Sequence, residues 1–228
     1  GYNIDFLLGP GINIHRHPLN GRNFEYFSED PYLSGVMAAA VSHGLAKTGC
    51  GATIKHFTAN NQELERRWVD SVASERAYRE IYLKPYEIAV KAGDVRAIMT
   101  SYNRVNGIHA PVNYDLLTVI LRGEWGYTGF VMTDWWPELC ATRPRPEGYK
   151  LNLAGCVRAQ NDVYMVCTDT MTLENNTEDA LHEGTLHRSE LLRCAANICR
   201  VLANSNCSKR FANAKADEAV ENFQANTT

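Results

Sequence analysis

The chain has no apolar run that approaches the roughly 20 residues needed by a membrane-spanning helix. It also has no block of lysines or arginines, and its formal net charge is −3. These two absences argue against a membrane protein and against nucleic-acid or anionic-membrane partners. The N-terminus lacks both a charged region and a small-residue cleavage site, so we predict no signal peptide.

Thiol and cofactor motifs are equally scarce. The seven cysteines are scattered, odd in number and without any Cys-x-x-Cys pair. This usage predicts reduced thiols in a cytoplasmic protein rather than disulfides or zinc. His15 and His17 alternate, but no other ligand spacing lies nearby, so no metal site is expected. No G-x-G-x-x-G, Walker or G-x-S-x-G pattern occurs.

The 228 residues are 45% hydrophobic, enough for a sizeable core, and they follow one repeated alternation. Continuous apolar stretches predict strands, and the stretches between them predict helices. Asp30 as a cap, Pro31 at the first helical position and Gly49 at the end favour a helix between them. The predicted strands are 3–14, 51–57, 95–103, 129–136 and 162–166, and the predicted helices are 30–49, 73–93, 113–126, 151–160 and 177–204.

Two of these helices carry possible breaks. Ser74 is a candidate cap for 73–93, where Pro85 predicts a kink or a break, and 177–204 is one helix or two with a break near Gly184. Strands of continuous apolar character that alternate with helices predict an α/β fold with a parallel sheet covered by helices. The polar, alanine-rich stretch 205–228 is interpreted as a tail or linker.

Polar and aromatic side chains stand where the predicted strands end, which is where α/β proteins place their sites. The clearest is Asp134, at the end of an apolar strand. A lone carboxylate in an apolar cleft is costly unless it is paired or hydrogen-bonded. An ionised, oriented carboxylate is also what a nucleophile at an anomeric carbon requires. A helix N-cap aspartate after a strand is the equally open alternative.

Cationic residues form a second group of candidates. Lys55 and Arg22 could lie near Asp134 and hold it ionised. The Arg22 guanidinium can donate two hydrogen bonds at once, to two hydroxyls or to a carboxylate, and Glu25 could be the partner that holds Arg22 in place. His56 follows Lys55 at the same strand end, where it is either a substrate donor or a satisfied core histidine.

Two tryptophans follow the aspartate directly. The flat apolar indole suits the C–H face of a sugar ring, and sugar sites often combine such rings with carboxylates. Trp135 and Trp136 could instead belong to the core, and we expect one of each.

Several long segments together resemble successive blocks of the family-3 glycoside hydrolases, most closely the bacterial β-glucosidase-like members. The resemblance runs from about residue 3 to 204 and implies a (β/α)₈ TIM-type barrel, of which about five βα units are present. Residues 1–204 would then form the C-terminal portion of the barrel domain. The segments are PLNGRNFEYFSEDP, GATIKHFTANNQELERR, SERAYREIYLKPYEIAVK, AIMTSYNRVNG, LLTVILRGEWGYTGFVMTDWW and ALHEGTLHRSELLRCAANICRVL.

The resemblance also implies roles for particular residues. Asp134 of MTDWW matches the nucleophile of a retaining mechanism, and Trp135 matches the aromatic residue beside it. Four further residues match positions that line the subsite for the terminal sugar, and no metal or organic cofactor is required by this chemistry. They are Arg22, Lys55, His56 and Tyr102.

The sequence departs from the family pattern in two respects. An Asp-Gly segment that would precede Gly1 is missing, and so is the α/β-sandwich domain whose glutamate is the acid/base in the β-glucosidase branch. The histidine-bearing loop of the β-N-acetylglucosaminidase branch is not matched either. Retaining chemistry needs a second carboxyl about 5 Å from the first. Glu63 and Glu138 are in-chain candidates, but surface or capping roles suit them better.

The sequence therefore predicts part of a cytoplasmic bacterial, retaining, exo-acting β-glycosidase of the β-glucosidase type. Its substrate would be a terminal non-reducing β-linked sugar on a small molecule or oligosaccharide. The chain alone is expected to be inactive, because five βα units cannot close a barrel. The alternatives are a degenerate family member that binds carbohydrate without turnover, and an unrelated α/β enzyme that uses Lys55 as a Schiff base.

Overall fold

The computed structural model describes residues 4–165, 174–210 and 212, and it confirms the α/β alternation. No helix in these ranges is long and apolar enough to cross a bilayer. The strands are β1 (Phe6–Leu7), β2 (Gly51–Phe57), β3 (Asp70–Ser71), β4 (Val95–Thr100), β5 (Arg104–Val105), β6 (Ile108–His109), β7 (Phe130–Trp135) and β8 (Val163–Met165). The helices are α1 (Pro31–Lys47), α2 (Glu75–Ala77), α3 (Lys84–Lys91), α4 (Leu153–Ala159), α6 (Thr177–His182) and α7 (Arg188–Ala203).

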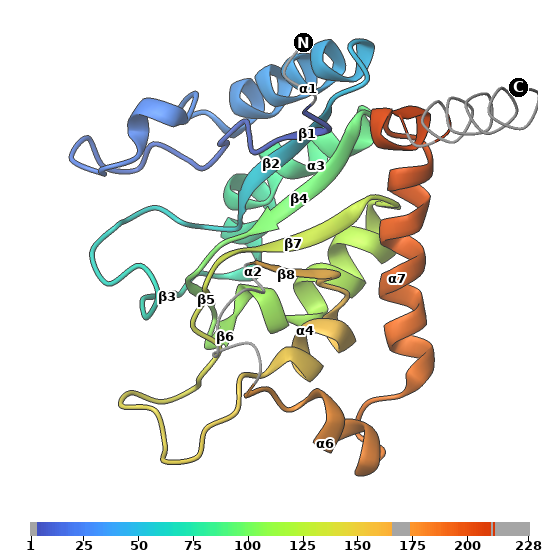
Figure 1. Ribbon diagram of the computed structural model, residues 1–228. Helices are drawn as coiled ribbons and strands as arrows, with labels where there is room; N and C mark the ends of the chain where they lie inside the picture. The colour runs from blue at the N-terminus through green and yellow to red at the C-terminus, as the bar shows by residue number, and fades with distance from the viewer. Residues whose placement is uncertain (1–3, 166–173, 211, 213–228) are drawn as a thin grey trace, which may run out of the picture.

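The main sheet has five strands in the order β1-β2-β4-β7-β8, and every neighbouring pair is parallel. The predicted parallel sheet is therefore confirmed. Because all strands point the same way, their C-terminal ends meet at one edge. Figure 1 shows the loops after β2 and β7, together with the loop before α1, gathered on that side.

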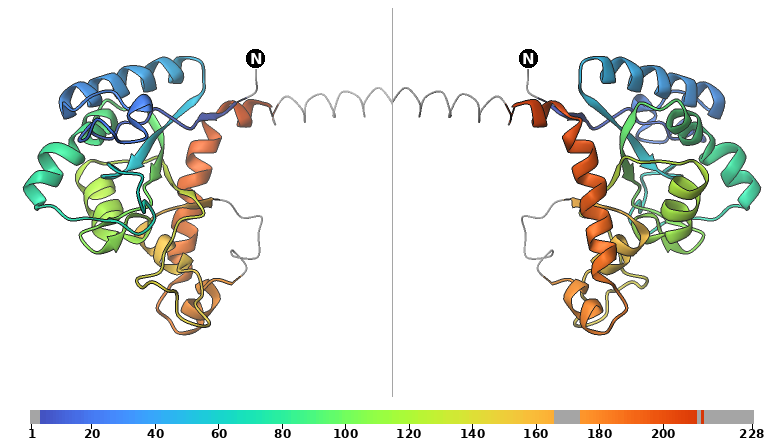
Figure 2. Two further views of the ribbon diagram at one scale, coloured as in Figure 1. Left: turned by 90° about the vertical axis from the view of Figure 1, so that its left-hand side faces the viewer. Right: turned by 90° about the vertical axis from the view of Figure 1, so that its right-hand side faces the viewer.

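Each face of the sheet is covered by different helices. Ile54, Ile98 and Val131 pack into a core with residues of α1, α3 and the π-helical segment η4 (Asp115–Glu124). The alternate residues of β4 and β7 point the other way and contact Ile198 and Val201 of α7. Figure 2 shows α7 on the opposite side of the sheet from α3.

Helix α1 begins and ends as predicted. The Asp30 carboxylate accepts the Tyr32 N–H at 2.8 Å, Pro31 occupies the first turn, and Gly49 has φ +80° just past the end. Its buried face carries small residues because α3 approaches closely: a Cβ on Gly35 would lie 2.8 Å from Cβ of Ile88. The helix therefore packs on α3 by backbone proximity rather than by large side chains.

The predicted helix 73–93 is divided into three segments. Ser74 caps α2 through its hydroxyl, which accepts the Ala77 N–H at 3.2 Å. The π-helical segment η2 (Tyr78–Tyr82) follows, closed by the Leu83 N–H on the Tyr78 carbonyl at 2.8 Å, and then α3 with Pro85 in its first turn. Proline lacks an N–H and crowds the preceding turn, so the predicted break falls just before it.

Other boundaries differ in smaller ways. The strand predicted over 3–14 is paired only at Phe6–Leu7 and in a bridge at Gly11, because Pro10 cannot donate a ladder bond. The predicted break near Gly184, at φ +70°, separates α6 from α7. A small second sheet, β3-β5-β6, and the short 3₁₀ turns η1 (Asn23–Glu25) and η3 (Ala110–Val112) were not predicted. Most of the tail predicted over 205–228 lies outside the described residues.

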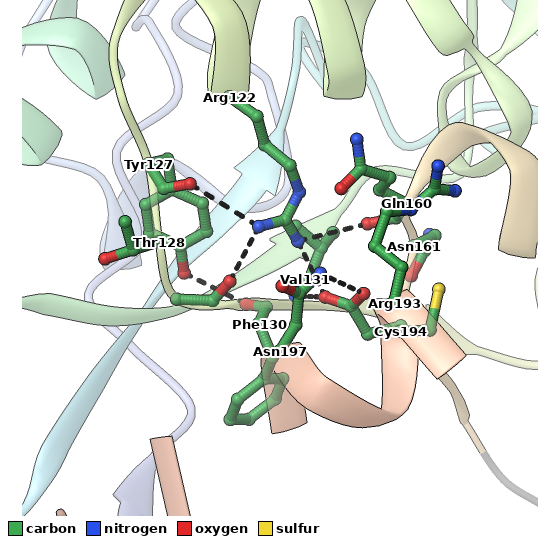
Figure 3. Close-up of polar contacts among 12 residues, drawn as sticks. Arg122, Tyr127, Thr128, Phe130, Val131, Gln160, Asn161, Arg193, Cys194 and Asn197 are labelled. Carbon is green, nitrogen blue, oxygen red and sulfur yellow. Dashed lines mark hydrogen bonds and ion pairs between the residues drawn. The ribbon is translucent and has the colours of Figure 1, made fainter. Parts of the chain in front are cut away.

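A buried ion pair anchors the N-terminal end of β7 (Figure 3). The Arg122 guanidinium contacts the Asp162 carboxylate at 2.7 Å and donates to the Gly129 carbonyl at 2.9 Å. The same carboxylate accepts the Val131 N–H at 2.8 Å and the Asn197 amide at 2.9 Å. One aspartate thus joins η4, β7 and α7, which fixes β7 at the end opposite Asp134.

Candidate active site

The C-terminal ends of β2, β4 and β7 enclose a pocket of about 380 Å³, a volume within the range of small-ligand sites. It contains all six residues that the sequence selected, brought together from segments up to 113 positions apart. The lining residues are Leu8, Arg22, Lys55, His56, Arg66, Arg67, Met99, Tyr102, Asp134, Trp135 and Trp136.

Asp134 is a strand residue and not a helix cap. It is the fifth residue of β7, its Oδ1 accepts the Trp135 N–H at 2.7 Å, and the next helix begins only at Leu153. Burial raises the pKa of Asp134, while the Trp135 N–H, the nearby Tyr102 hydroxyl and Arg22 act to lower it. The N-cap alternative is therefore wrong, and the group is a desolvated carboxyl at a pocket wall.

The predicted partner of Arg22 is confirmed, and Lys55 has a partner that was not predicted. The Arg22 Nε donates to the Glu25 carboxylate, whose other oxygen lies 3.3 Å from Lys55 Nζ. Lys55 is thus paired with Glu25 rather than with Asp134. The single negative charge of Glu25 is shared by two positive side chains. The part of the pocket that these two residues line therefore has a net positive charge.

His56 is both buried and in the site. Its side chain is 2% exposed, and its Nε2 lies 3.6 Å from Oδ2 of Asp134. Burial, helped by Arg22, Lys55 and Arg66, lowers the pKa of His56 well below its ordinary value. The imidazole is therefore neutral and the core interpretation is confirmed, while the role of His56 as a substrate donor stays a prediction.

The backbone of His56 is fixed by an amide from a neighbouring segment. The Asn13 side chain accepts the His56 N–H at 2.8 Å and donates to the His56 carbonyl at 3.0 Å. Both groups are buried. Near the end of β2 the Asn13 amide thus satisfies the backbone N–H and carbonyl of His56, as the backbone of a neighbouring strand would.

Two arginines in the pocket were missed by the sequence reasoning. The Arg66 and Arg67 guanidinium carbons lie 4.7 Å and 5.3 Å from the centre of the Tyr102 ring, distances at which cation–π attraction operates. The Tyr102 hydroxyl donates to the Trp135 carbonyl at 2.7 Å, and burial raises the pKa of Tyr102 to about 12. The dense charge of the segment 62–67 was the available signal.

Neither tryptophan belongs fully to the core. Trp135 is 42% exposed, Trp136 is half-buried, and both line the pocket. Their rings meet edge to face at 5.6 Å. The expectation of one core and one pocket indole is thus wrong, because φ of +48° at Trp136 turns the chain as β7 ends and brings both rings to the mouth.

The two weaker acid candidates are held in ion pairs outside the pocket lining. Glu63 forms an ion pair with Arg66 at 3.1 Å, and the buried Glu138 forms one with Arg145 at 2.7 Å. The expected surface role is therefore wrong for Glu138, although its carboxylate does accept the nearby Cys140 N–H at 3.2 Å. Among the described residues that line the pocket, Asp134 is the single carboxylate.

The histidine pair considered as a metal site has local backbone partners. Nε2 of His15 lies 3.1 Å from the Asn23 carbonyl, and Nδ1 of His17 accepts the Leu19 N–H at 3.1 Å. Within the described residues, no group of three or more potential metal ligands comes together. The six cysteines in that part of the chain form no disulfide there, and Cys167 lies outside it.

Two larger hollows lie elsewhere on the molecule. One of about 430 Å³ is bordered by η2, η4 and the hairpin of β5 and β6, and its lining is mainly apolar. Another of about 710 Å³ lies among the loops 16–21, 61–64 and 69–72. Neither contains Asp134 or any other of the six residues of the predicted sugar site, so the pocket at the strand ends is the candidate active site.

Proteins of known family resemble this chain over most of its length. Residues 1–201 match the model of the glycosyl hydrolase family 3 N-terminal domain. The chain belongs to glycosyl hydrolase family 3. A β-glucosidase from Ruminococcus albus is 55% identical over 218 residues, which cover 96% of this chain and 23% of that protein.

Other relatives of this family-3 chain carry different names. An exo-α-(1→6)-L-arabinopyranosidase from Bifidobacterium longum is 54% identical over 132 residues, covering 58% of this chain and 17% of that protein. The structure of β-glucosidase 3B from Thermotoga neapolitana in complex with glucose has a TM-score of 0.83 and 44% identity. The match covers 92% of this chain and 28% of that one. The chain thus spans about a quarter or less of the curated relatives.

Family membership confirms the expected fold class. The five parallel strands form part of a TIM-type barrel like that of the structural relatives. The end of the barrel domain at residue 204 stays a prediction.

Proposed function

We propose that this chain carries the nucleophile and most of the sugar-binding residues of a retaining, exo-acting β-glucosidase. The observation that supports it best is the position of Asp134, a desolvated carboxyl that shares a pocket with Arg22, Lys55, His56 and Arg66. Family membership and the β-glucosidases among the relatives support the same substrate class. The substrate would be a terminal non-reducing β-linked glucose.

The chemistry follows from one carboxylate and its neighbours. An Asp134 oxygen forms a bond to the anomeric carbon as the bond from that carbon to the leaving oxygen breaks. An acid protonates the leaving oxygen, and its conjugate base then removes a proton from the water that releases the sugar. The two displacements together retain the anomeric configuration. No metal or organic cofactor takes part in these steps.

The surrounding groups suit this role. The Trp135 N–H holds Oδ1 of Asp134 at 2.7 Å, which orients the carboxylate. Arg22, Lys55 and Arg66 offer donors to sugar hydroxyls, and the exposed Trp135 ring offers a flat apolar face. Because burial raises the pKa of Asp134, the carboxylate is less stabilised than in water and is correspondingly more basic.

The acid/base is proposed to lie outside this chain. Among the described lining residues Asp134 has no second carboxyl beside it, and Glu63 and Glu138 are engaged by arginines. We therefore expect the 228-residue chain alone to hydrolyse an aryl β-glucoside at a negligible rate. Turnover close to that of the full-length protein would contradict this expectation.

A mechanism-based label tests the nucleophile. Full-length protein is incubated with a 2-deoxy-2-fluoro β-glucoside that has a good leaving group, then digested and mapped by mass spectrometry. We expect the sugar on the peptide that contains Asp134, and Asp134→Asn should abolish both labelling and turnover. Asp70→Asn, in β3 of the small second sheet and outside the pocket, is the matched control and should label normally. A label on another side chain would refute the assignment.

The arabinopyranosidase relative defines a second candidate substrate. An α-L-arabinopyranoside has the ring and hydroxyl arrangement of a β-D-galactopyranoside without its hydroxymethyl group. It differs from a β-glucoside both there and in the orientation of the C4 hydroxyl, and a pocket that tolerates these differences could accept it. Aryl α-L-arabinopyranoside and aryl β-glucoside should be compared by kcat/KM in one preparation. A higher value for the arabinoside would replace glucose as the proposed sugar and leave the Asp134 chemistry unchanged.

We also propose a cytoplasmic location, on the basis of the six cysteines that form no disulfide in the described part of the chain. Fractionation of cells that express the full-length protein tests it. Recovery of the protein outside the cytoplasm would overturn the proposal.

A further inference from the structure

A chain of buried polar groups runs behind His56, on the side away from Asp134. We propose that Tyr26 is a positioning residue that holds His56 in the tautomer with hydrogen on Nε2, so that an N–H faces the pocket. The link is a contact of 3.4 Å between the Tyr26 hydroxyl and Nδ1 of His56. Both side chains are buried.

The direction of these hydrogen bonds is set by the carboxylate of Glu63, at the end of the series away from His56. The Asn60 amide nitrogen lies 3.2 Å from Oε1 of Glu63, whose other oxygen is bound by Arg66 at 3.1 Å. A carboxylate accepts and does not donate, so the nitrogen of the Asn60 amide must face it. This contact removes the usual ambiguity between the oxygen and nitrogen of an amide.

The orientation of Asn60 then decides the direction of the tyrosine hydroxyl. The same amide nitrogen, which has a second hydrogen, donates to the Tyr26 oxygen at 3.3 Å. The tyrosine oxygen is thereby an acceptor on one side, and its own hydrogen is free to point at His56. The same hydrogen bond from Asn60 acts to lower the pKa of Tyr26, although burial raises it well above its ordinary value.

The hydroxyl hydrogen fixes the tautomer. When the hydroxyl donates to Nδ1 of His56, the single hydrogen of the neutral imidazole is on Nε2. Nε2 lies 3.6 Å from Oδ2 of Asp134, a distance at which an N–H is attracted to a carboxylate and a lone pair is repelled. The opposite tautomer would also leave the Tyr26 hydroxyl facing a second donor.

For the proposed β-glucosidase the consequence is a donor aimed at the sugar. An Nε2–H can donate to a sugar hydroxyl oxygen next to the nucleophile, whereas a bare nitrogen cannot. The effect on catalysis rests on the proposed function, but the tautomer itself does not. Tyr26 does not itself line the pocket and reaches it through its contact with His56.

The first experiment is independent of activity. Full-length protein with ¹⁵N-labelled histidine is studied by NMR, and His56 is assigned as the signal missing from His56→Gln. We expect the hydrogen on Nε2 in the wild type and a shift toward Nδ1 in Tyr26→Phe. Hydrogen on Nδ1 in the wild type overturns the proposal, whether or not the protein hydrolyses glucosides.

The second experiment is a mutant cycle on kcat/KM for an aryl β-glucoside. Tyr26→Phe should lower it about five- to tenfold, the effect of one hydrogen bond. In His56→Gln, whose amide N–H does not depend on a tautomer, the same substitution should cost less than about twofold. Tyr127→Phe is the matched control, because it loses a buried bond of 2.9 Å to the Phe130 carbonyl far from the site.

The cycle separates this proposal from a merely structural role. Tyr127→Phe should lower thermal stability about as much as Tyr26→Phe and leave kcat/KM unchanged. An equal loss of kcat/KM from Tyr26→Phe in both His56 backgrounds would overturn the proposal. A wild-type protein that does not hydrolyse the glucoside would refute the proposed function, and the NMR result would still decide the tautomer.

Discussion

Arg122→Met should be among the most destabilising single changes in the sheet, although it lies at the end away from the pocket. The Arg122 side chain is 10% exposed and the Asp162 side chain is not exposed at all. Removing the arginine deletes an ion pair of 2.7 Å and the bond of 2.9 Å to the Gly129 carbonyl. Breaking a buried pair from one side typically costs about 3–5 kcal/mol, because it leaves an uncompensated charge.

The loss should depend on pH in a definite direction. Burial raises the pKa of Asp162, and Arg122 is the strongest group that opposes the rise, so the variant's carboxyl should have a still higher pKa. A carboxyl whose folded pKa exceeds its unfolded pKa binds protons more tightly when folded. Stability therefore increases as the pH falls through the folded pKa, by about 1.4 kcal/mol per unit of difference. The deficit of Arg122→Met should be smaller at about pH 5 than at about pH 8.

Hydrogen exchange followed by mass spectrometry gives a local readout in the full-length protein. The free energy of opening is taken from peptides of β7 in the wild type, in Arg122→Met and in Arg76→Met. Arg76 makes an exposed helix pair at 3.0 Å with Glu80, in which the side chains are 83% and 60% exposed. Its loss should cost less than about 0.5 kcal/mol. Equal costs for the two substitutions, or a larger deficit at low pH, would refute the reasoning.

Three further predictions concern the site and the packing. Asp134 must be ionised to attack, so the acidic limb of the pH profile of kcat/KM should give a pKa above the ordinary value for an aspartate. A pH–rate profile measures this pKa, and a value at or below the ordinary one would contradict the prediction. Glu25→Gln should raise KM about tenfold by releasing Lys55, which steady-state kinetics measures. Gly35→Ala should destabilise the fold by about 1–3 kcal/mol, whereas Gly44→Ala on the open side of α1 should stabilise it by about 0.5–1 kcal/mol; denaturation midpoints of the two variants decide it.

The sequence predicted the features that depend on local pattern. Strand β2 has the predicted bounds of 51–57, because its apolar run ends at a cluster of polar residues. The cap at Asp30 and the turn at Gly184 follow from the chemistry of single residues. The gathering of Asp134 and Lys55 in one pocket follows from the parallel order of the strands, since such strands end on one edge.

Features that depend on contacts between distant segments were not predictable in this way. Arg122 and Asp162 are 40 positions apart, and no periodicity links a helix arginine to an aspartate before a short strand. Arg66 enters the pocket from a loop whose course is set by Glu63 and Tyr102. The partner of Lys55 was not predicted, because Glu25 lies in a different loop and only the folded chain brings the two together.

The two ends of β7 have complementary roles. At its start the Val131 N–H is held by Asp162, and at its end Asp134 is carried into the pocket three residues later, about 10 Å along the strand. Between them the Thr133 hydroxyl accepts the Met165 N–H at 2.8 Å, which keeps the register with β8. Because a nucleophile must be held within about 0.5 Å of its productive position, a rigid strand anchored at its far end is a better support than a loop. The burial that raises the pKa of Asp134 works against stability at the pocket, and the ion pair and hydrogen bonds that hold the opposite end of β7 offset it.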